Sequence, residues 1–199
     1  LNALAFSEEE VSSAEATVNE LEGELAPMRD ALSILESKLA RFSFEYADPE
    51  RGFDRSKVKG LVGELISVNT PEAMTALEVT AGGKLFNVVV DTERTGSALL
   101  KKGKLRRRVT IIPLNKINDR VVKDSVMQRA KALAGDEAKL ALELVGYEDE
   151  VQAAMKYVFG NTIVCENGTM AKKLAFDPDV RTKAVTLEGD VFDPSGTLT

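Results

Sequence analysis

The sequence contains no histidine among its 199 residues. This absence removes Ser-His-Asp and Cys-His catalytic arrangements, histidine-ligated zinc and the commonest general base. The sequence also lacks the G-x-x-x-x-G-K-[ST] phosphate loop and the G-x-G-x-x-G dinucleotide fingerprint. The run Glu148-Asp149-Glu150 is predicted to begin a helix, where negative charge complements the helix dipole. We therefore expect a non-enzymatic chain with no catalytic residues, no metal and no cofactor, and keep a small enzyme as the minor alternative.

Cysteine is nearly as scarce, since Cys165 is the only one and no internal disulfide can form. Its apolar surroundings predict a buried, unreactive thiol in a reducing compartment. No apolar run approaches the ~20 residues that span a membrane, and no signal peptide is visible. Because the chain begins with Leu1 rather than methionine, we expect it to be a piece of a longer protein.

Charge divides the chain into an acidic first part and a mildly basic remainder. Residues 1–50 hold 12 acidic and 3 basic side chains, whereas residues 51–199 hold 20 acidic and 23 basic ones. In the acidic part, apolar residues alternate spacings of three and four, as the a and d positions of a heptad do. They are Val11, Ala14, Val18, Leu21, Leu25, Met28, Leu32, Leu35, Leu39 and Phe42, with Leu4 extending the frame.

This repeat predicts a coiled-coil arm over residues 1–42, with a long surface helix of the domain itself as the alternative. No matching heptad follows, so the arm's partner strand is expected beyond Thr199 or on another chain. Pro27 lies at an outward position of the repeat and should kink or interrupt the helix.

After a predicted linker over 43–57, the chain alternates strands and helices. Strands are predicted at 58–66, 85–90 and 105–112. A helix begins at Pro71 and ends at Gly82-Gly83, and a short one, capped by Asp91 or Thr92, ends at Gly103. The result is a β-α-β-α-β unit.

The second unit is predicted to be richer in helix. Apolar periodicity predicts three helices that end at Gly135, Gly146 and Gly160. Strands at 162–165 and 184–187 flank a helix at 170–175. No exact internal repeat is visible, and the fold class is α+β, with one subdomain over 58–118 and a second over 119–199.

Two glycines interrupt the first predicted strand at Gly60 and Gly63. A strand tolerates such glycines at a bulge or where another backbone comes close. Both readings stay open on the residues alone: a local bulge inside one monomer, or an edge approached by another chain.

The most concentrated charge spans the end of the short helix and the start of the third predicted strand of the first unit. Six cations fall within eight positions: Lys101, Lys102, Lys104, Arg106, Arg107 and Arg108. If 105–112 is a strand, Arg106 and Arg108 project from one face. The run is either a solvated face or a phosphate-binding patch, and without interleaved aromatics it predicts weak, salt-sensitive contact with a nucleic-acid backbone.

Four stretches resemble one known family: DPERGFDRSKVKGLVGELISV, ALEVTAGGKLFNVVVDTERTG, RRRVTIIPLNKI and TLEGDVFDPSGTLT. They are similar to the hinge domain of the structural maintenance of chromosomes (SMC) proteins, and most closely to the condensin subunit of type two. The resemblance covers about residues 42–199. It implies a two-subdomain hinge of mixed sheets and helices, preceded by the end of a coiled-coil arm.

The resemblance also implies a function. A hinge pairs through exposed strand edges with a second, related condensin hinge, or with its own copy, at the far end of long arms from ATPase heads. Glycines matching the family pattern are implied to lie at the dimer interface: Gly60, Gly63, Gly160, Gly189 and Gly196. Lys101 to Arg108 becomes the candidate DNA-binding surface, and the location implied is nucleus and chromosome, with cytoplasm. The rival reading is a nucleic-acid-binding module whose self-association is incidental.

Overall fold

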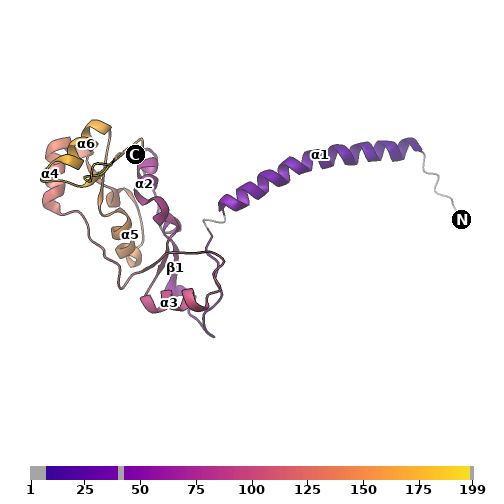
Figure 1. Cartoon of the computed structure of the whole chain (residues 1–199), viewed down its shortest axis with the longest axis horizontal. Coiled ribbons are helices and arrows are strands. Elements are labelled where there is room, and N and C mark those ends of the chain that lie inside the picture. The colour runs from indigo at the N-terminus through magenta and orange to yellow at the C-terminus, as the bar shows by residue number, and fades with distance from the viewer. Residues whose placement is uncertain (1–7, 40–42, 198–199) are drawn as a thin grey trace. The chain divides into compact units, whose positions relative to one another are not determined.

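The computed structural model describes residues 8–39 and 43–197, with side chains described for 11–35 and 43–197. The chain divides into two units, Leu1–Ser43 and Phe44–Thr199. The described part of the first unit contains helix α1 (Glu8–Leu39), which runs through Pro27 without a break (Figure 1). The predicted helix is therefore confirmed. Of the two effects predicted for Pro27, a kink or an interruption, the interruption is wrong. Leu4 and Phe42 lie outside the described residues.

The described side chains of α1, residues 11–35, include a row of exposed apolar residues. The large apolar ones among them are all exposed, Met28 at 65% and Leu21 at 53% for example. Such a row of exposed apolar side chains is what a coiled-coil helix presents before it meets its partner strand. Pairing of this arm remains a prediction.

The first half of the compact unit has the predicted β-α-β-α-β order. Its elements are β1 (Val58–Leu61), α2 (Met74–Ala81), β2 (Val88–Val90), α3 (Glu93–Lys102) and β3 (Ile111–Pro113). The sheet order is β1-β2-β3, with β1 antiparallel to β2 and β2 parallel to β3. Of the two predicted caps for α3, Thr92 is the one used, because its side chain accepts from the Thr95 N–H.

The second half contains three α-helices and a second sheet of four strands. Its elements are α4 (Asp124–Ala134), β4 (Lys139–Leu140), α5 (Gln152–Phe159), β5 (Thr162–Cys165), α6 (Gly168–Phe176), β6 (Lys183–Thr186) and β7 (Val191–Phe192). The order is β4-β5-β6-β7, and only β5 and β6 run parallel. The helix predicted to end at Gly146 is wrong: strand β4 and a 3₁₀ turn, Ala141–Leu144, occupy that stretch.

The two halves repeat one order of elements although no exact sequence repeat was visible. In each half a short outer strand, β1 or β4, lies antiparallel to the first of two parallel strands, and a helix, α3 or α6, connects those two. A 3₁₀ turn follows the outer strand in both, Val62–Glu64 and Ala141–Leu144. The halves meet at equivalent points, where Ser67 and Gly146 exchange two backbone hydrogen bonds of 2.8 Å.

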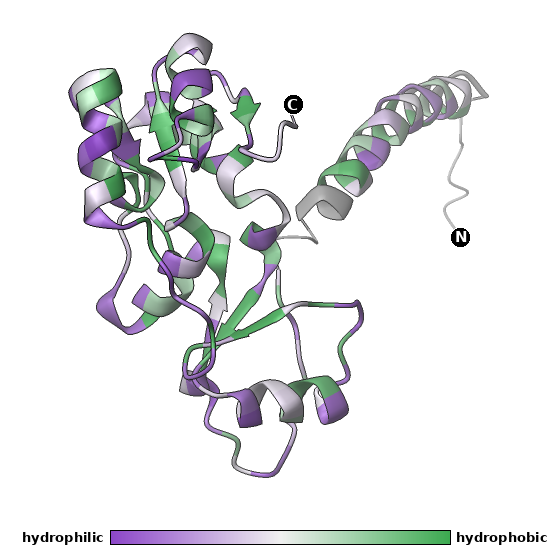
Figure 2. Cartoon of the chain, turned by 60° about the vertical axis from the view of Figure 1, so that its left-hand side comes forward, coloured by the Kyte–Doolittle hydropathy of each residue, from purple (hydrophilic) through white to green (hydrophobic). Residues whose placement is uncertain are grey.

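One apolar core joins the halves. Val89 and Ile112 of the first sheet cluster with Val164 and Val185 of the second, and the fully buried Phe159 of α5 belongs to the same cluster. Figure 2 shows hydrophobic residues concentrated along the strands of this unit. The predicted boundary near residue 118 therefore separates two sheets that share this cluster, while each half also keeps a smaller apolar cluster of its own.

The stretch predicted as a linker is packed structure from Phe44 onward. Phe44, Tyr46 and Phe53 pack against the buried cluster formed by Leu61, Val88, Val90 and Leu99. The rings of Phe44 and Tyr46 stack at 5.3 Å, and the guanidinium of Arg55 lies 5.2 Å from the Tyr46 ring. Burying aromatic surface offsets the entropy lost when this segment becomes ordered. The many polar residues of the segment made it look like a linker in the sequence.

Candidate association edges and basic surface

Strand β1 forms an outer edge of the first sheet, and Gly60 lies within it. The register shifts between Val58 and Gly60, and Gly60 has φ of +123°, a conformation that side chains rarely adopt. The strand is thus irregular at Gly60, as the bulge alternative expects, and the approach of another chain to this edge remains a prediction. Among residues 8–39 and 43–197, β1 pairs with a strand on one side only, so its other edge is open there.

Gly63 lies outside any strand, because β1 ends at Leu61 and Val62–Glu64 is a 3₁₀ turn. The predicted strand over 58–66 is thus wrong beyond Leu61. A Cβ at Gly63 would lie 3.4 Å from the Leu85 carbonyl oxygen, an ordinary van der Waals contact, so packing within the chain does not require glycine at this position.

The other three predicted interface glycines occupy different settings. Gly160 ends α5 and is buried; a Cβ there would lie 3.0 Å from Val121 Cγ2 and 3.1 Å from the Arg120 carbonyl oxygen. Gly189 turns the chain between β6 and β7 with φ of +99°, against Thr75 and Val79 of α2. Gly196, with φ of +96°, is exposed and has open space around it. Each glycine thus meets a local backbone or packing need, and their role in association remains a prediction.

The basic run spans the end of α3 and the loop before β3. Lys101 and Lys102 lie in the last turn of α3, where cations complement the helix dipole. The strand predicted over 105–112 is wrong for most of its length, since β3 begins only at Ile111. The predicted alternation survives, because Arg106 and Arg108 are exposed while Arg107 is partly buried.

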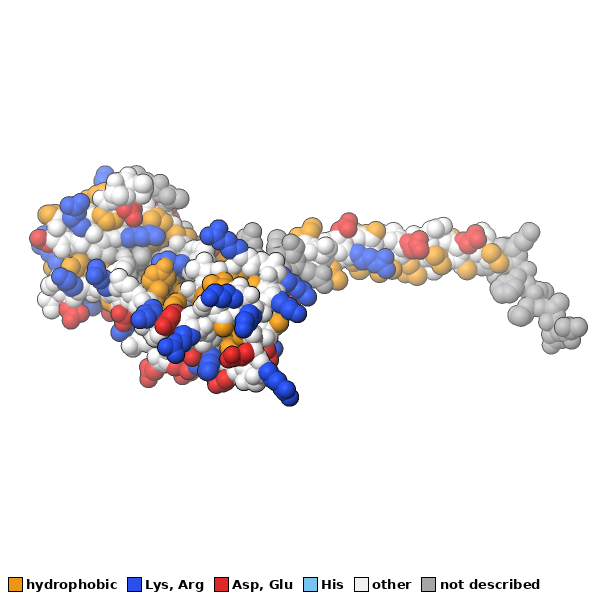
Figure 3. Space-filling view, turned by 60° about the horizontal axis from the view of Figure 1, so that its bottom comes forward, with side chains coloured by type: hydrophobic (Ala, Val, Ile, Leu, Met, Phe, Trp, Pro, Cys, Tyr) orange, Lys and Arg blue, Asp and Glu red, His pale blue; other side chains and the backbone are white. Residues whose placement is uncertain are grey.

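Acidic side chains partly neutralise the positive charge of the surface formed by Lys101 to Arg108. The Arg106 guanidinium lies 3.3 Å from the Glu45 carboxylate, and its own side chain is 86% exposed. Glu50 and Glu93 line a shallow depression together with Lys101 and Lys102. Figure 3 shows Lys and Arg side chains spread over the face of the compact unit that is turned forward, with acidic side chains along its lower border. The surface offers several cations at once without being uniformly basic.

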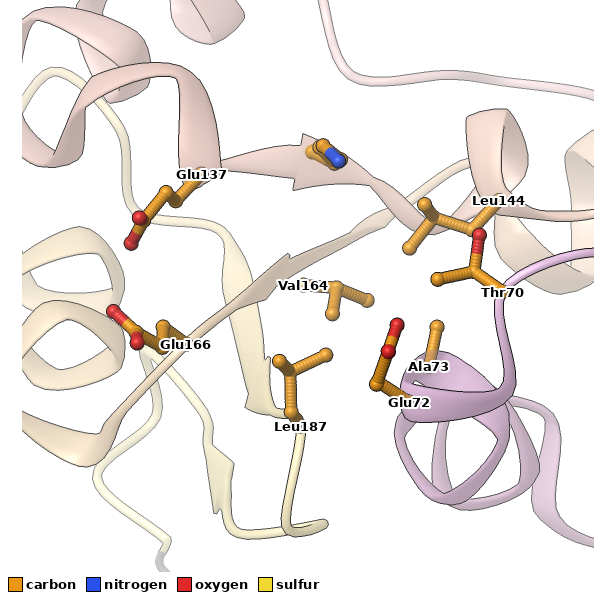
Figure 4. A pocket seen from close by; sticks show the side chains of 9 residues that line it. Thr70, Glu72, Ala73, Glu137, Leu144, Val164, Glu166 and Leu187 are labelled. Atoms are coloured by element: carbon orange, nitrogen blue, oxygen red, sulfur yellow. The ribbon is translucent and has the colours of Figure 1, made fainter.

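A groove of about 250 Å³ lies over the second sheet, between the start of the α2 region and strand β4. Its floor contains the buried Val164 and the partly buried Leu187, as Figure 4 shows. Glu137 and Glu166 face each other at one end, and the Glu166 carboxylate raises the pKa of Glu137. This pair could not be predicted from the sequence, because its members lie 29 positions apart on separate elements.

Three properties of the described residues concern thiol reactivity, metal binding and membrane insertion. Burial raises the pKa of the Cys165 thiol to about 11, so it stays protonated and unreactive at neutral pH, as predicted. Within residues 8–39 and 43–197, no three His, Cys, Asp or Glu side chains are grouped to hold a metal ion. Nor does any helix in these ranges have the length and apolar character needed to cross a membrane.

The two sheets, with strand orders β1-β2-β3 and β4-β5-β6-β7, belong to a region that matches a known family. Residues 55–175 match the family model described as the SMC proteins flexible hinge domain. The chain belongs to this family, as its sequence motifs predicted. The matched part is the hinge, a region distinct from an ATPase head.

The curated relatives that this chain matches are SMC proteins of type two. The chain is 59% identical over 173 residues to structural maintenance of chromosomes protein 2-1 of Arabidopsis thaliana, covering 86% of this chain and 15% of that protein. To protein 2 of Schizosaccharomyces pombe it is 55% identical over 170 residues (84% and 14%), and to protein 2 of Homo sapiens 49% identical over 180 residues (90% and 15%). The predicted likeness to the type-two subunit is therefore confirmed, over about 15% of these relatives' length.

Solved hinge structures share the fold. A Pyrococcus furiosus SMC hinge with an extended coiled coil is similar with a TM-score of 0.71 and 25% identity, over 96% of this chain and 66% of that one. An asymmetric dimer of the Geobacillus stearothermophilus SMC hinge gives a TM-score of 0.62 and 26% identity, over 94% and 76%. The predicted α+β hinge preceded by a long helix is confirmed.

Proposed function

We propose that this chain is the association module of a condensin-type SMC subunit, with no catalytic role of its own. The observation that carries the proposal is the open outer strand in each sheet of a chain that belongs to the hinge family. Unpaired backbone groups on such edges are ready to pair with another chain. The partner is the hinge of a second, related condensin subunit, and the isolated chain self-associates more weakly.

The rest of the molecule fits this role. Helix α1 exposes a row of apolar side chains, as expected of a coiled-coil arm that pairs with another helix. A module of this kind joins two subunits of a chromosome-organising ATPase, and it works on chromosomes in the nucleus and is also present in the cytoplasm. Chromosome condensation then depends on the junction that it forms.

The mass of the particle in solution tests the proposal. Sedimentation equilibrium of this chain, alone and mixed with the hinge of the related condensin subunit, is expected to show a one-to-one heterodimer in the mixture. A mixture that sediments as two separate monomers at micromolar concentrations would contradict the association role.

A second function, contact with DNA, is supported by the six cations between Lys101 and Arg108. We expect the double variant Arg106→Glu/Arg108→Glu to weaken binding of single-stranded DNA and to lower the salt slope by about 0.7 for each lost phosphate contact. The control is Lys131→Glu/Lys172→Glu, which changes two exposed lysines on α4 and α6 by the same charge. If both variants weaken DNA binding equally, the cations between Lys101 and Arg108 contribute only through the net charge of the protein and do not form a DNA-binding site.

A further inference from the structure

The outer edge of β1 is occupied at one backbone donor by a side chain of the same chain. Leu61 lies opposite Val88 of β2, but the next residue, Val62, makes the backbone bond toward that strand, from its N–H to the Asn87 carbonyl at 3.0 Å. In an antiparallel pair, adjacent residues direct their N–H groups to opposite sides. The Leu61 N–H therefore points away from β2, and it donates to Glu64 Oε2 at 3.1 Å.

The same carboxylate also stands beside Gly60. A Cβ built on Gly60 would lie 3.2 Å from Glu64 Oε2. Because the bulge at Gly60 turns this part of the strand, the chain folds back through the 3₁₀ turn Val62–Glu64 and returns Glu64 to the edge. One exposed side chain thus satisfies the outward donor and fills the space next to the glycine.

A groove of about 370 Å³ continues from this point. Glu64 and Glu150 both line it, and Glu150 pairs with Lys59 of β1 at 2.8 Å. Leu65, Ile66 and Tyr147 supply apolar lining. An extended segment that reached β1 along this groove would meet Glu64 at the position where its own carbonyl has to bind.

The second half of the fold provides a comparison. Glu143 occupies the equivalent step after β4, as the third residue of the 3₁₀ turn Ala141–Leu144. Within the described part of the chain, only Glu64 bonds back to the outer strand that precedes it. The arrangement is therefore particular to β1 and is not a general consequence of the repeated turn.

We propose that Glu64 is a removable latch on the outer edge of β1. This inference rests on the proposed association function and adds its regulation. In the free chain the Glu64 carboxylate accepts the Leu61 hydrogen bond and discourages unspecific strand pairing. In the associated state a carbonyl of the incoming strand accepts that bond, and the Glu64 side chain turns to solvent, so association exchanges one hydrogen bond for another.

Association of latch variants with the related condensin hinge gives the first test. Glu64→Ala needs no exchange of bonds and is expected to associate about three- to tenfold more tightly than the unchanged chain. Glu64→Gln, which keeps a weaker neutral acceptor and the shape of the side chain, should fall between the two. The controls are Glu143→Ala, the equivalent position in the second half, and Glu148→Ala, which removes the same charge from the same groove. Both controls should leave the affinity unchanged.

Amide exchange of the free chain gives the second test. The Leu61 amide is expected to exchange several-fold faster in Glu64→Ala, while the Val62 amide, bonded to Asn87, keeps its rate. An unchanged Leu61 rate would overturn the latch, and so would an equal gain of affinity in Glu148→Ala, which would show a charge effect.

The two proposals can fail separately. If the unchanged chain associates and Glu64→Ala binds no more tightly, the latch is wrong and the association function stands. If neither chain associates with the partner hinge, the association function is wrong and the latch fails with it.

Discussion

The two halves of the compact unit follow one order of elements, but their corresponding glycines work under different constraints. Gly82 ends α2 with φ of +49° and has open space where a Cβ would lie. Gly160 ends α5 with φ of −72°, and Val121 and Arg120 crowd the position of its missing Cβ. One glycine is needed for its backbone conformation and the other for space. A shared fold pattern therefore does not give equivalent residues the same task.

The shared core gives the largest expected effect and tests whether the halves are separable. Phe159 is fully buried in the cluster that both sheets line, so Phe159→Ala should lower the free energy of unfolding by about 3–5 kcal/mol. Thermal or urea unfolding of residues 44–199 should still show one transition, since both halves lose the same core.

The matched control is Phe176→Ala at the end of α6, where the side chain is 45% exposed. Its loss should be much smaller. Two separate transitions, with only the later half affected by Phe159→Ala, would show that the halves are independent domains.

Substitutions of the glycines that follow α2 and α5 should have the second-largest effect on the free energy of unfolding. Gly160→Ala should cost about 1–3 kcal/mol of unfolding free energy, because the added methyl group meets the Arg120 carbonyl and the Val121 side chain. Gly83→Ala, which follows α2 in open space, should change stability by less than about 1 kcal/mol. Urea unfolding of the two variants measures both values, and equal losses would remove the contrast between the halves.

The acidic pair of the second half gives the smallest effect, and it depends on pH. The Glu166 carboxylate raises the pKa of Glu137, so the folded state holds the Glu137 proton more tightly than the unfolded state does. The stability that this proton contributes is complete at pH values below the unfolded pKa and is lost as pH rises through the higher folded pKa.

Glu137→Gln should therefore be more stable than the unchanged chain at neutral pH, with the difference vanishing in acid. Unfolding midpoints at several pH values measure this difference. A variant that is less stable at neutral pH would show that Glu137 contributes a favourable contact instead of repulsion.

The sequence predicted the helices better than the strands, for a physical reason. Thr92 and the glycines at 135 and 160 mark helix ends by local chemistry, and the structure uses all three. The strand predicted at 58–66 was too long because Val62, Leu65 and Ile66 are apolar, yet they pack from a 3₁₀ turn and the chain after it. Periodicity cannot separate these cases when both bury the same side chains.

The candidate surfaces were predicted in part. Counting charges was enough to find the basic run, and its alternation of exposed and partly buried residues held although no strand formed there. The contact of Glu64 with Leu61 could not be predicted, because it depends on the bulge at Gly60 and the turn that follows. The Phe44, Tyr46 and Phe53 cluster was hidden by the polar residues between its members.

Backbone amide exchange across the complex tests the central claim most directly. The chain should be compared free and bound to the related condensin hinge. Edge pairing predicts that amides of the outer strands, β1 at Val58–Leu61 and the other sheet edges, gain protection, while those of the central strands β2 and β5 change little. Protection gained only along Lys101 to Arg108, with every outer strand unchanged, would contradict association through strand edges.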